Sequence, residues 1–152
     1  MHRSIRLLAA ASVVAAAAVT LTPQADAATS SLQFRTFVAD QPGADLPLSQ
    51  YKLNREYITV KNTSTRSVKV GGYRIRDKAN HTFVFPSGYT IRAGSSVRVH
   101  TGRGTNTSTD VYWKQGYYVW NNTGDTAYLS TPGGTRLDVC TYYKNSSGRK
   151  YC

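Results

Sequence analysis

Carboxylates and histidines are the side chains of this chain that could do acid–base chemistry. Asp77 and Asp125 each follow a strand-and-turn pattern, and two carboxylates facing each other across a cleft could hydrolyse a glycoside. His81 and His100 are single histidines on or beside predicted strands, without a nucleophile and acid in a described motif. A carboxylate at a turn more often accepts hydrogen bonds from backbone amides. We therefore predict structural roles for both acids and do not expect an enzyme.

Three further features have both a chemical and a structural interpretation. Glu56 opens a predicted strand where the alternation aims it inward, so it needs hydrogen bonds or a cation; we expect it to hold a neighbouring loop. Gly102-Arg103-Gly104 could meet a phosphate through backbone amides, but a flexible loop is the commoner use. Trp113 and Trp120 could stack on a sugar, and we favour their packing in the core.

The first 27 residues are typical of a secretory signal peptide. Arg3 and Arg6 give a basic start, residues 7–21 are small and apolar, and Ala25-Asp26-Ala27 supplies a cleavage pattern. The apolar run is shorter than the roughly 20 residues of a membrane-spanning helix, which makes an uncleaved anchor the weaker alternative. We expect cleavage after about Ala27, a secreted protein and no transmembrane segment in the mature chain.

The chain is strongly basic, with 19 Lys and Arg against 8 Asp and Glu. Without the leader, 17 basic and 7 acidic residues remain, a net charge of +10. Such a field favours anionic partners, namely nucleic acid, teichoic-type polymers, anionic lipid or acidic polysaccharide. The alternative is that the charge serves only solubility.

The two cysteines, Cys140 and Cys152, are expected to form one disulfide. An even count in an exported protein favours a bridge, which would pin the C-terminal tail and contribute about 2–3 kcal/mol. Two thiols with only His81 and His100 in the mature chain match no zinc spacing. We predict neither a metal site nor a cofactor.

Short alternating runs of apolar and polar residues recur through the mature chain, separated by Gly, Pro, Asn, Ser and Thr. The segment Asp40–Asn54 is predicted to be a loop, and no window has the 3.6-residue period of a helix. The pattern predicts an all-β sandwich or barrel. The alternation also predicts the inward side chains: Ile58, Val60, Tyr73, Ile75, Phe83, Phe85, Val97, Val99, Ala127, Leu129, Leu137 and Val139.

The predicted outward side chains include most of the candidate binding residues. His100 and Asp138 are expected to face solvent, as are Tyr57 and Tyr128. The candidates for contact with an anionic polymer are Lys61, Arg74, Arg76, Arg98 and Arg136 on strands and Arg103 in a loop. Whether they share one patch depends on strand order, which spacing does not reveal.

Six separate pieces of the chain, between about Glu56 and Tyr142, resemble the lamin-tail domain of secreted bacterial proteins. They are EYITVKNTS from Glu56, GGYRIRD ending at Asp77, FVFPSG over 83–88, Ile91 and Gly94 before the Val97/Val99 strand, Tyr112-Trp113, and WNNTGD over 120–125. Tyr73 departs from the family, which usually has Trp there, and the Cys140/Cys152 extension is not expected in nuclear relatives.

The resemblance implies an immunoglobulin-like β-sandwich without catalysis of its own. Bacterial members often accompany secreted hydrolases, and nuclear members are linked to DNA and protein binding. The resulting division is a signal peptide over 1–27, an N-terminal strand and loop over 28–54, a lamin-tail-like sandwich over 55–143 and a disulfide-closed tail over 144–152.

Three functions remain open from the sequence. The first is a secreted, non-enzymatic module that holds nucleic acid or a cell-envelope polymer on a basic face, chiefly through phosphates. The second is a structural or protein-interaction domain of the cell envelope. The third, which we favour least, is a small secreted hydrolase that depends on Asp77 or Asp125.

Overall fold

The computed structural model describes residues 30–152, so the predicted leader lies outside the described residues. Over this range the chain forms eleven strands and one helical turn. The elements are β1 (Leu32–Val38), α1 (Gln50–Leu53), β2 (Tyr57–Asn62), β3 (Val68–Lys69), β4 (Arg74–Arg76), β5 (Thr82–Val84), β6 (Thr90–Ile91), β7 (Ser96–His100), β8 (Asp110–Tyr112), β9 (Gly124–Ser130), β10 (Arg136–Tyr143) and β11 (Arg149–Tyr151).

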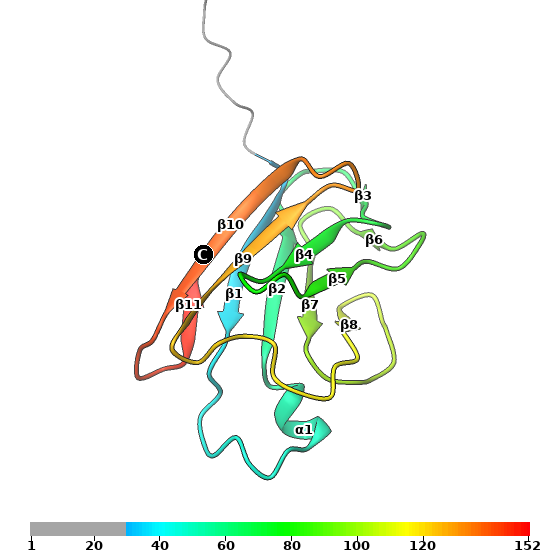
Figure 1. The fold of residues 1–152 in the computed structure, drawn as a ribbon. Helices are drawn as coiled ribbons and strands as arrows, with labels where there is room; N and C mark the ends of the chain where they lie inside the picture. The colour runs from blue at the N-terminus through cyan, green and yellow to red at the C-terminus, as the bar shows by residue number, and fades with distance from the viewer. Residues whose placement is uncertain (1–29) are drawn as a thin grey trace, which may run out of the picture.

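Two sheets are layered face to face (Figure 1). The five-stranded sheet has the order β11-β1-β2-β7-β8, the four-stranded sheet has the order β10-β9-β4-β5, and β3 pairs with β6 in a small ribbon. All pairs are antiparallel except β7 with β8. The prediction of an all-β, immunoglobulin-like sandwich is confirmed.

The core lies between the sheets and follows the predicted alternation. Ile58 and Val60 from β2 face Ile75 from β4, and all three are fully buried. Trp113 and Trp120 are also buried, with their ring centroids 5.7 Å apart in an edge-to-face contact. Both tryptophans therefore belong to the core, as predicted.

The predicted orientation of β10 was right for Arg136, which is exposed, and wrong from Asp138 onward, since Asp138 is partly buried. A register shift between Arg136 and Asp138 places an irregularity in the β9–β10 pairing, and such a bulge reverses which residues face inward. Val139 is consequently 39% exposed, whereas Cys140 and Tyr142 are buried. The bulge also leaves Leu137 only partly buried against the core.

Two local predictions on the other layer also need correction. His100 is buried although it shares the outward side with Arg98, because the rings of Tyr57 and Tyr112 lie 5.5 and 5.1 Å from its ring. The predicted loop Asp40–Asn54 contains the helical turn α1. The side chain of Ser49 caps this turn by accepting a hydrogen bond from the backbone N–H of Lys52.

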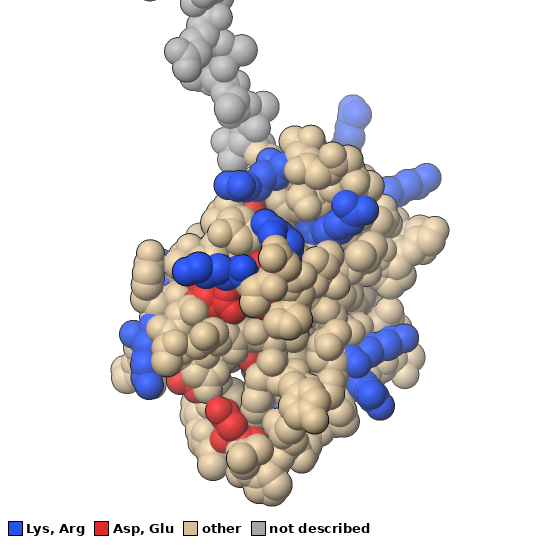
Figure 2. Space-filling model, viewed as in Figure 1, with Lys and Arg blue, Asp and Glu red and all other residues tan. Residues whose placement is uncertain are grey.

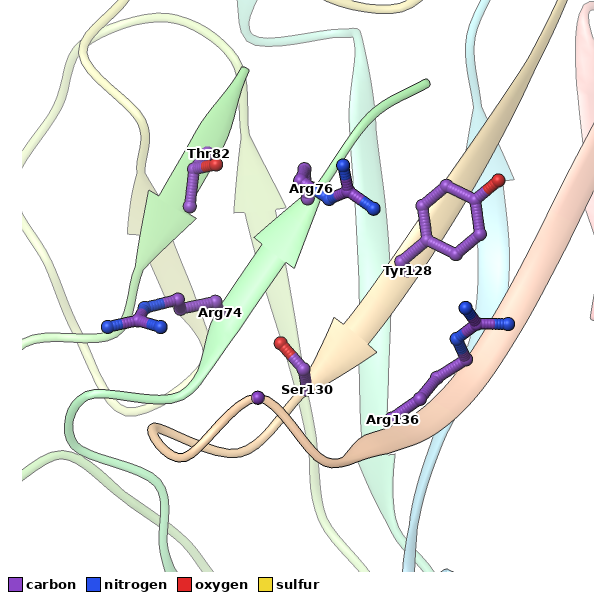
Figure 3. Close-up of a pocket in the computed structure, with 7 residues that line it drawn as sticks. Arg74, Arg76, Thr82, Tyr128, Ser130 and Arg136 are labelled. Carbon is purple, nitrogen blue, oxygen red and sulfur yellow. The ribbon is translucent and has the colours of Figure 1, made fainter. Parts of the chain in front are cut away.

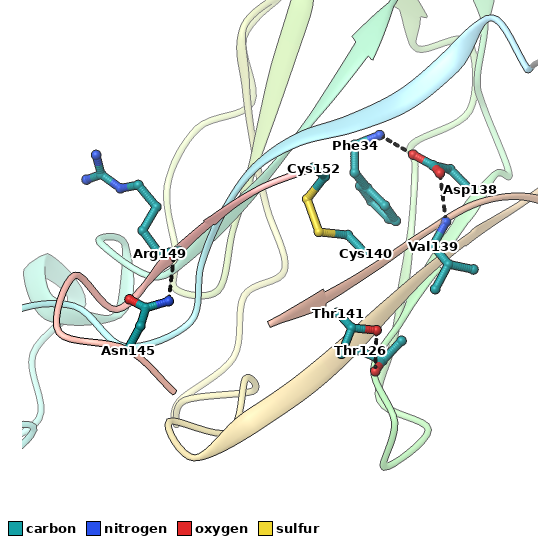
Figure 4. Close-up of a disulfide and its surroundings, with 9 residues drawn as sticks. All are labelled: Phe34, Thr126, Asp138, Val139, Cys140, Thr141, Asn145, Arg149 and Cys152. Atoms are coloured by element: carbon teal, nitrogen blue, oxygen red, sulfur yellow. Dashed lines mark hydrogen bonds between the residues drawn. A yellow bond between two sulfur atoms is a disulfide. The ribbon is translucent and has the colours of Figure 1, made fainter. Parts of the chain in front are cut away.

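The C-terminal tail is held by both a strand pairing and a disulfide (Figure 4). β11 pairs with the edge of β1 that lies away from β2. Cys140 on β10 is bonded to Cys152 with a Cα–Cα distance of 5.8 Å. The bridge therefore joins the last residue of the chain, beside the five-stranded sheet, to an inward position on the four-stranded sheet.

Reduction of the Cys140–Cys152 bridge is expected to lower the free energy of unfolding by about 2–3 kcal/mol, because the closed loop restricts the unfolded chain. Urea unfolding with and without reductant measures the change. A Cys140→Ala/Cys152→Ala variant that shows no further response to reductant is the control. An unchanged unfolding midpoint after complete reduction would contradict the expectation.

Asp138 connects the two sheets at the bulge (Figure 4). Its Oδ2 accepts a hydrogen bond of 2.6 Å from the backbone N–H of Phe34 on β1, where the β1–β2 register also shifts. Asp138→Ala should leave this N–H without a partner and cost about 1–3 kcal/mol of stability. Thermal unfolding measures the loss, and Asp138→Asn, which keeps an acceptor oxygen, should recover part of it.

Candidate anion-binding face

The structure divides the six predicted basic residues among three places. Arg74, Arg76 and Arg136 come from β4 and β10 of the four-stranded sheet, whereas Lys61 and Arg98 come from β2 and β7 of the five-stranded sheet. Arg103 lies in the loop after β7. The six therefore do not form one patch, because alternation predicts the side of a strand but not the sheet that contains it.

Strand register brings three arginines together on the outer side of the four-stranded sheet. Arg74 and Arg136 are both paired with Ser130 of β9, from opposite sides. Arg76 is paired with Tyr128, two residues earlier on β9. Since residues two apart on a strand share a side, all five side chains project from one surface. We call Arg74, Arg76, Tyr128 and Arg136 the arginine face.

A hollow of about 430 Å³ lies on this surface, with Thr82, Ser130 and Gly134 completing its lining. Tyr128 lies between two guanidinium groups (Figure 3). The Cζ of Arg76 lies 5.1 Å from the centre of the Tyr128 ring and that of Arg136 lies 5.3 Å from it. Both distances fit cation–π contacts. The Arg76 guanidinium also donates a hydrogen bond to the side-chain oxygen of Asn80.

The contacts with Tyr128 have two consequences for a ligand. They restrict the rotation of two long side chains, which reduces the entropy lost on binding. They also place two guanidinium groups within 5.3 Å of the ring centre, where these groups compete with a base for stacking on the ring. The face therefore presents guanidinium N–H donors, which match the geometry of phosphate and carboxylate.

Carboxylates do not line this hollow, and the reason lies in how the chain uses its acids. None of the seven acids among residues 30–152 is exposed, whereas fifteen of the seventeen Lys and Arg are. Within the same range, Arg98 is the only Lys or Arg that forms an ion pair. The surface charge is therefore almost uncompensated, and Figure 2 shows basic side chains gathered over the upper half of the view.

Asp77 and Asp125 serve the backbone, as predicted. Asp77 Oδ1 accepts from the N–H of His81 at 2.7 Å, and its Oδ2 lies 2.6 Å from His81 Nδ1. Asp125 accepts from three backbone N–H groups, those of Lys78, Asn121 and Thr126. The Asp77–His81 pair resembles the orienting half of a catalytic triad, but no hydroxyl or thiol of the described residues bonds to the remaining nitrogen of His81.

Glu56 holds a loop, as predicted. Its side chain is fully buried, and its Oε1 accepts from the Thr101 hydroxyl at 2.6 Å and from the N–H groups of Val119 and Trp120 at 2.9 and 3.3 Å. Burial raises the pKa of Glu56 to about 8, although these three hydrogen bonds oppose the shift.

The loop around Arg103, where a phosphate cradle was the weaker alternative to a plain loop, is tied to α1 and the residue after it. The backbone N–H of Arg103 donates to Gln50 Oε1 at 2.7 Å, and its carbonyl accepts from Asn54 Nδ2 at 2.9 Å. These contacts with α1 and the residue after it occupy the backbone amide of Arg103, whereas its guanidinium is exposed.

Arg98 is also less available than predicted, because its Nε lies 2.8 Å from Asp110 Oδ1. Burial tends to raise the pKa of Asp110, but hydrogen bonds from Thr109, His100 and Arg98 outweigh it and lower the pKa below its usual value. Lys61 is only half-exposed on the same sheet.

Sequence reasoning missed Tyr128, Thr82 and Ser130 as lining residues. Alternation along the strand predicts that Tyr128 and Thr82 point outward. Their position beside the arginines, however, depends on β9 lying between β4 and β10. No spacing in the sequence carries that order.

Fold and site together define a small β-sandwich module whose outer surface is arginine-rich. Within residues 30–152 no three His, Cys, Asp or Glu side chains come together as metal ligands would, and the described helix is far too short to cross a membrane.

The family model of the lamin tail domain matches residues 25–144, and the chain belongs to this family. The family consists of immunoglobulin-like, binding-type domains and is not a family of enzymes. The tail that carries β11 and Cys152 lies beyond the matched residues. No curated protein matches the chain.

Proposed function

We propose that this protein is a non-enzymatic module that binds a phosphodiester polymer, either nucleic acid or a cell-envelope polymer, through the arginine face. The observation that supports the proposal is the convergence of Arg74, Arg76 and Arg136 around Tyr128, in a hollow without a carboxylate. Membership in a family of binding domains is consistent with it. Contact is to phosphate oxygens, which carry no information on base sequence.

We further propose that the protein acts outside the cell. The disulfide is a bond that persists in oxidising compartments, and the predicted leader points to the same location. Structural or protein-interaction roles in the envelope are the alternative, and binding of a protein partner that survives high salt would favour them.

The arginine face is tested with Arg74→Ala/Arg76→Ala/Arg136→Ala. Affinity for a phosphodiester polymer should fall at least tenfold at low salt. The variant loses three phosphate contacts, and each neutralised phosphate contributes about 0.7–0.9 to the slope of log affinity against log salt concentration. That slope should therefore become shallower by about 2–3. Fluorescence anisotropy with a DNA duplex and, separately, with poly(glycerol phosphate) measures both quantities and separates the two sources.

The matched control is Arg66→Ala/Lys69→Ala/Arg92→Ala, which removes the same charge from exposed positions outside the hollow. It should cost much less affinity than the arginine-face variant. Equal losses in the two variants would show that binding follows net charge alone, and salt-independent binding would remove the proposal.

A further inference from the structure

We propose that one copy of this protein bridges two phosphodiester polymers, because a second basic hollow lies on the opposite outer surface of the sandwich. This inference rests on the proposed function and adds a second site to it. The hollow, of about 250 Å³, has Arg55, Tyr57, Arg98, His100 and Arg149 in its lining. We call this second pocket, with Arg55, Arg98, Arg149 and His100 in its lining, the opposite hollow.

Three separate segments supply the cations of this hollow. Arg55 lies in the turn between α1 and β2, Arg98 on β7 and Arg149 on β11. β2 and β7 are neighbours with Thr59 paired to Arg98, and β11 reaches the same sheet through β1. The tail beyond the family match therefore contributes one of the three arginines.

Two of these arginines are held by tyrosines and form no ion pair within the part of the chain that the structure describes. Arg55 lies 5.6 Å from the centre of the Tyr51 ring and donates to its hydroxyl at 3.3 Å. Arg149 donates to the Tyr151 hydroxyl at 3.3 Å. The arrangement resembles that of the arginine face, where a tyrosine also orients the guanidinium groups.

The third arginine, Arg98, shares a carboxylate partner with His100. Asp110 Oδ1 lies 2.8 Å from both Arg98 Nε and His100 Nε2, and His100 Nδ1 lies 2.7 Å from the carbonyl oxygen of Asn54. Asp110 therefore compensates the charge of Arg98, and Arg55 and Arg149 supply the positive charge that remains in the hollow.

The two hollows face away from each other. The arginine face projects from the four-stranded sheet and the opposite hollow from the five-stranded sheet, and packed sheets are about 10 Å apart before their outer side chains are added. A DNA duplex has a persistence length of about 150 base pairs, so it is too stiff to wrap around so small a module. Two occupied hollows therefore mean two polymer segments.

Bridging is tested by co-capture. A biotinylated duplex on beads and a fluorescent duplex of the same sequence are mixed with the full protein, and fluorescence on the beads is measured. Wild-type protein should carry the fluorescent duplex to the beads. Arg55→Ala/Arg149→Ala, which leaves the Arg98–Asp110 pair intact, should reduce co-capture at least tenfold while still binding a single duplex at saturating concentration.

The charge-matched control is Arg66→Ala/Arg92→Ala, outside both hollows, which should keep most of the co-capture. A second arm replaces the fluorescent duplex by labelled poly(glycerol phosphate) and shows whether one of the two hollows accepts the envelope-type polymer while the other holds the duplex. Co-capture of duplex alone would assign nucleic acid to both sites.

The outcomes separate the inference from the proposed function. If wild-type protein binds neither polymer in anisotropy, the proposed function fails. If it binds but gives no co-capture, or if the two double variants lose co-capture equally, the inference fails and the proposed function stands. Co-capture restored by mixing the arginine-face variant with Arg55→Ala/Arg149→Ala would assign bridging to a protein dimer and overturn the inference.

Discussion

The stability of the wild-type protein is expected to fall by about 2 kcal/mol between pH 5.5 and 7.5 through Glu56 alone. The Glu56→Gln variant should lack this part of the pH dependence. The carboxyl group is fully buried, and burial raises its pKa from 4.5 to about 8. Between these values the folded chain keeps a proton that the unfolded chain has released.

The sign follows from proton linkage. The free energy of unfolding changes with pH in proportion to the protons bound by the unfolded chain minus those bound by the folded chain. Because Glu56 binds its proton more tightly in the folded chain, its contribution is complete below pH 4.5 and is lost as the pH rises through about 8. The largest slope is about −1.4 kcal/mol per pH unit.

Urea unfolding across this pH range measures the effect as the difference between wild-type and Glu56→Gln protein, so that groups common to both cancel. Glutamine keeps an oxygen for the hydroxyl of Thr101 and the N–H groups of Val119 and Trp120. Glu56→Ala, the control, also lacks the charge but leaves these donors unpaired, so it should be about 3 kcal/mol less stable than Glu56→Gln at every pH. Parallel pH profiles for wild-type and Glu56→Gln protein would rule out a proton held on Glu56.

The layers of the fold could be predicted because each strand carries a local pattern. Alternation placed Ile58, Val60 and Ile75 inside, and the inward aim of Glu56 followed from the same count. The prediction failed at β10. One bulge there turns Val139 outward and Cys140 inward, the reverse of what alternation predicts. A bulge depends on how two strands pair, and the sequence of one strand does not reveal it.

The candidate site was less predictable because it depends on strand order. Arg74 and Arg76 are near in sequence, but Arg136 reaches them only because β9 lies between β4 and β10. The exposure of His100 was mispredicted for a similar reason. Alternation along β7 puts His100 on the outer face of the sheet. The rings of Tyr57 and Tyr112, from neighbouring strands, then cover His100.

Gly148→Ala is expected to destabilise the C-terminal tail by about 3 kcal/mol or more, since it combines a backbone strain with a steric overlap. Gly148 has a φ of +61°, and a Cβ added there would lie 1.4 Å from the carbonyl oxygen of Asp40. The Gly148 carbonyl also accepts from the N–H groups of Ala39 and Asp40, each at 3.1 Å. The turn therefore cannot move aside without losing the contacts that seat β11 beside β1.

Gly94→Ala separates the two causes, because Gly94 has a similar φ of +65° and no atom within 4 Å of an added Cβ. Gly94→Ala should lower the free energy of unfolding by only roughly 1–2 kcal/mol, the cost of holding a residue with a Cβ in the left-handed conformation. Thermal unfolding gives the overall loss. Hydrogen exchange at Arg149–Tyr151 reports on β11 itself, which remains tethered through the Cys140–Cys152 bridge even when its pairing opens. Equal losses for the two variants, with unchanged exchange in β11, would show that the tail is not seated against Asp40.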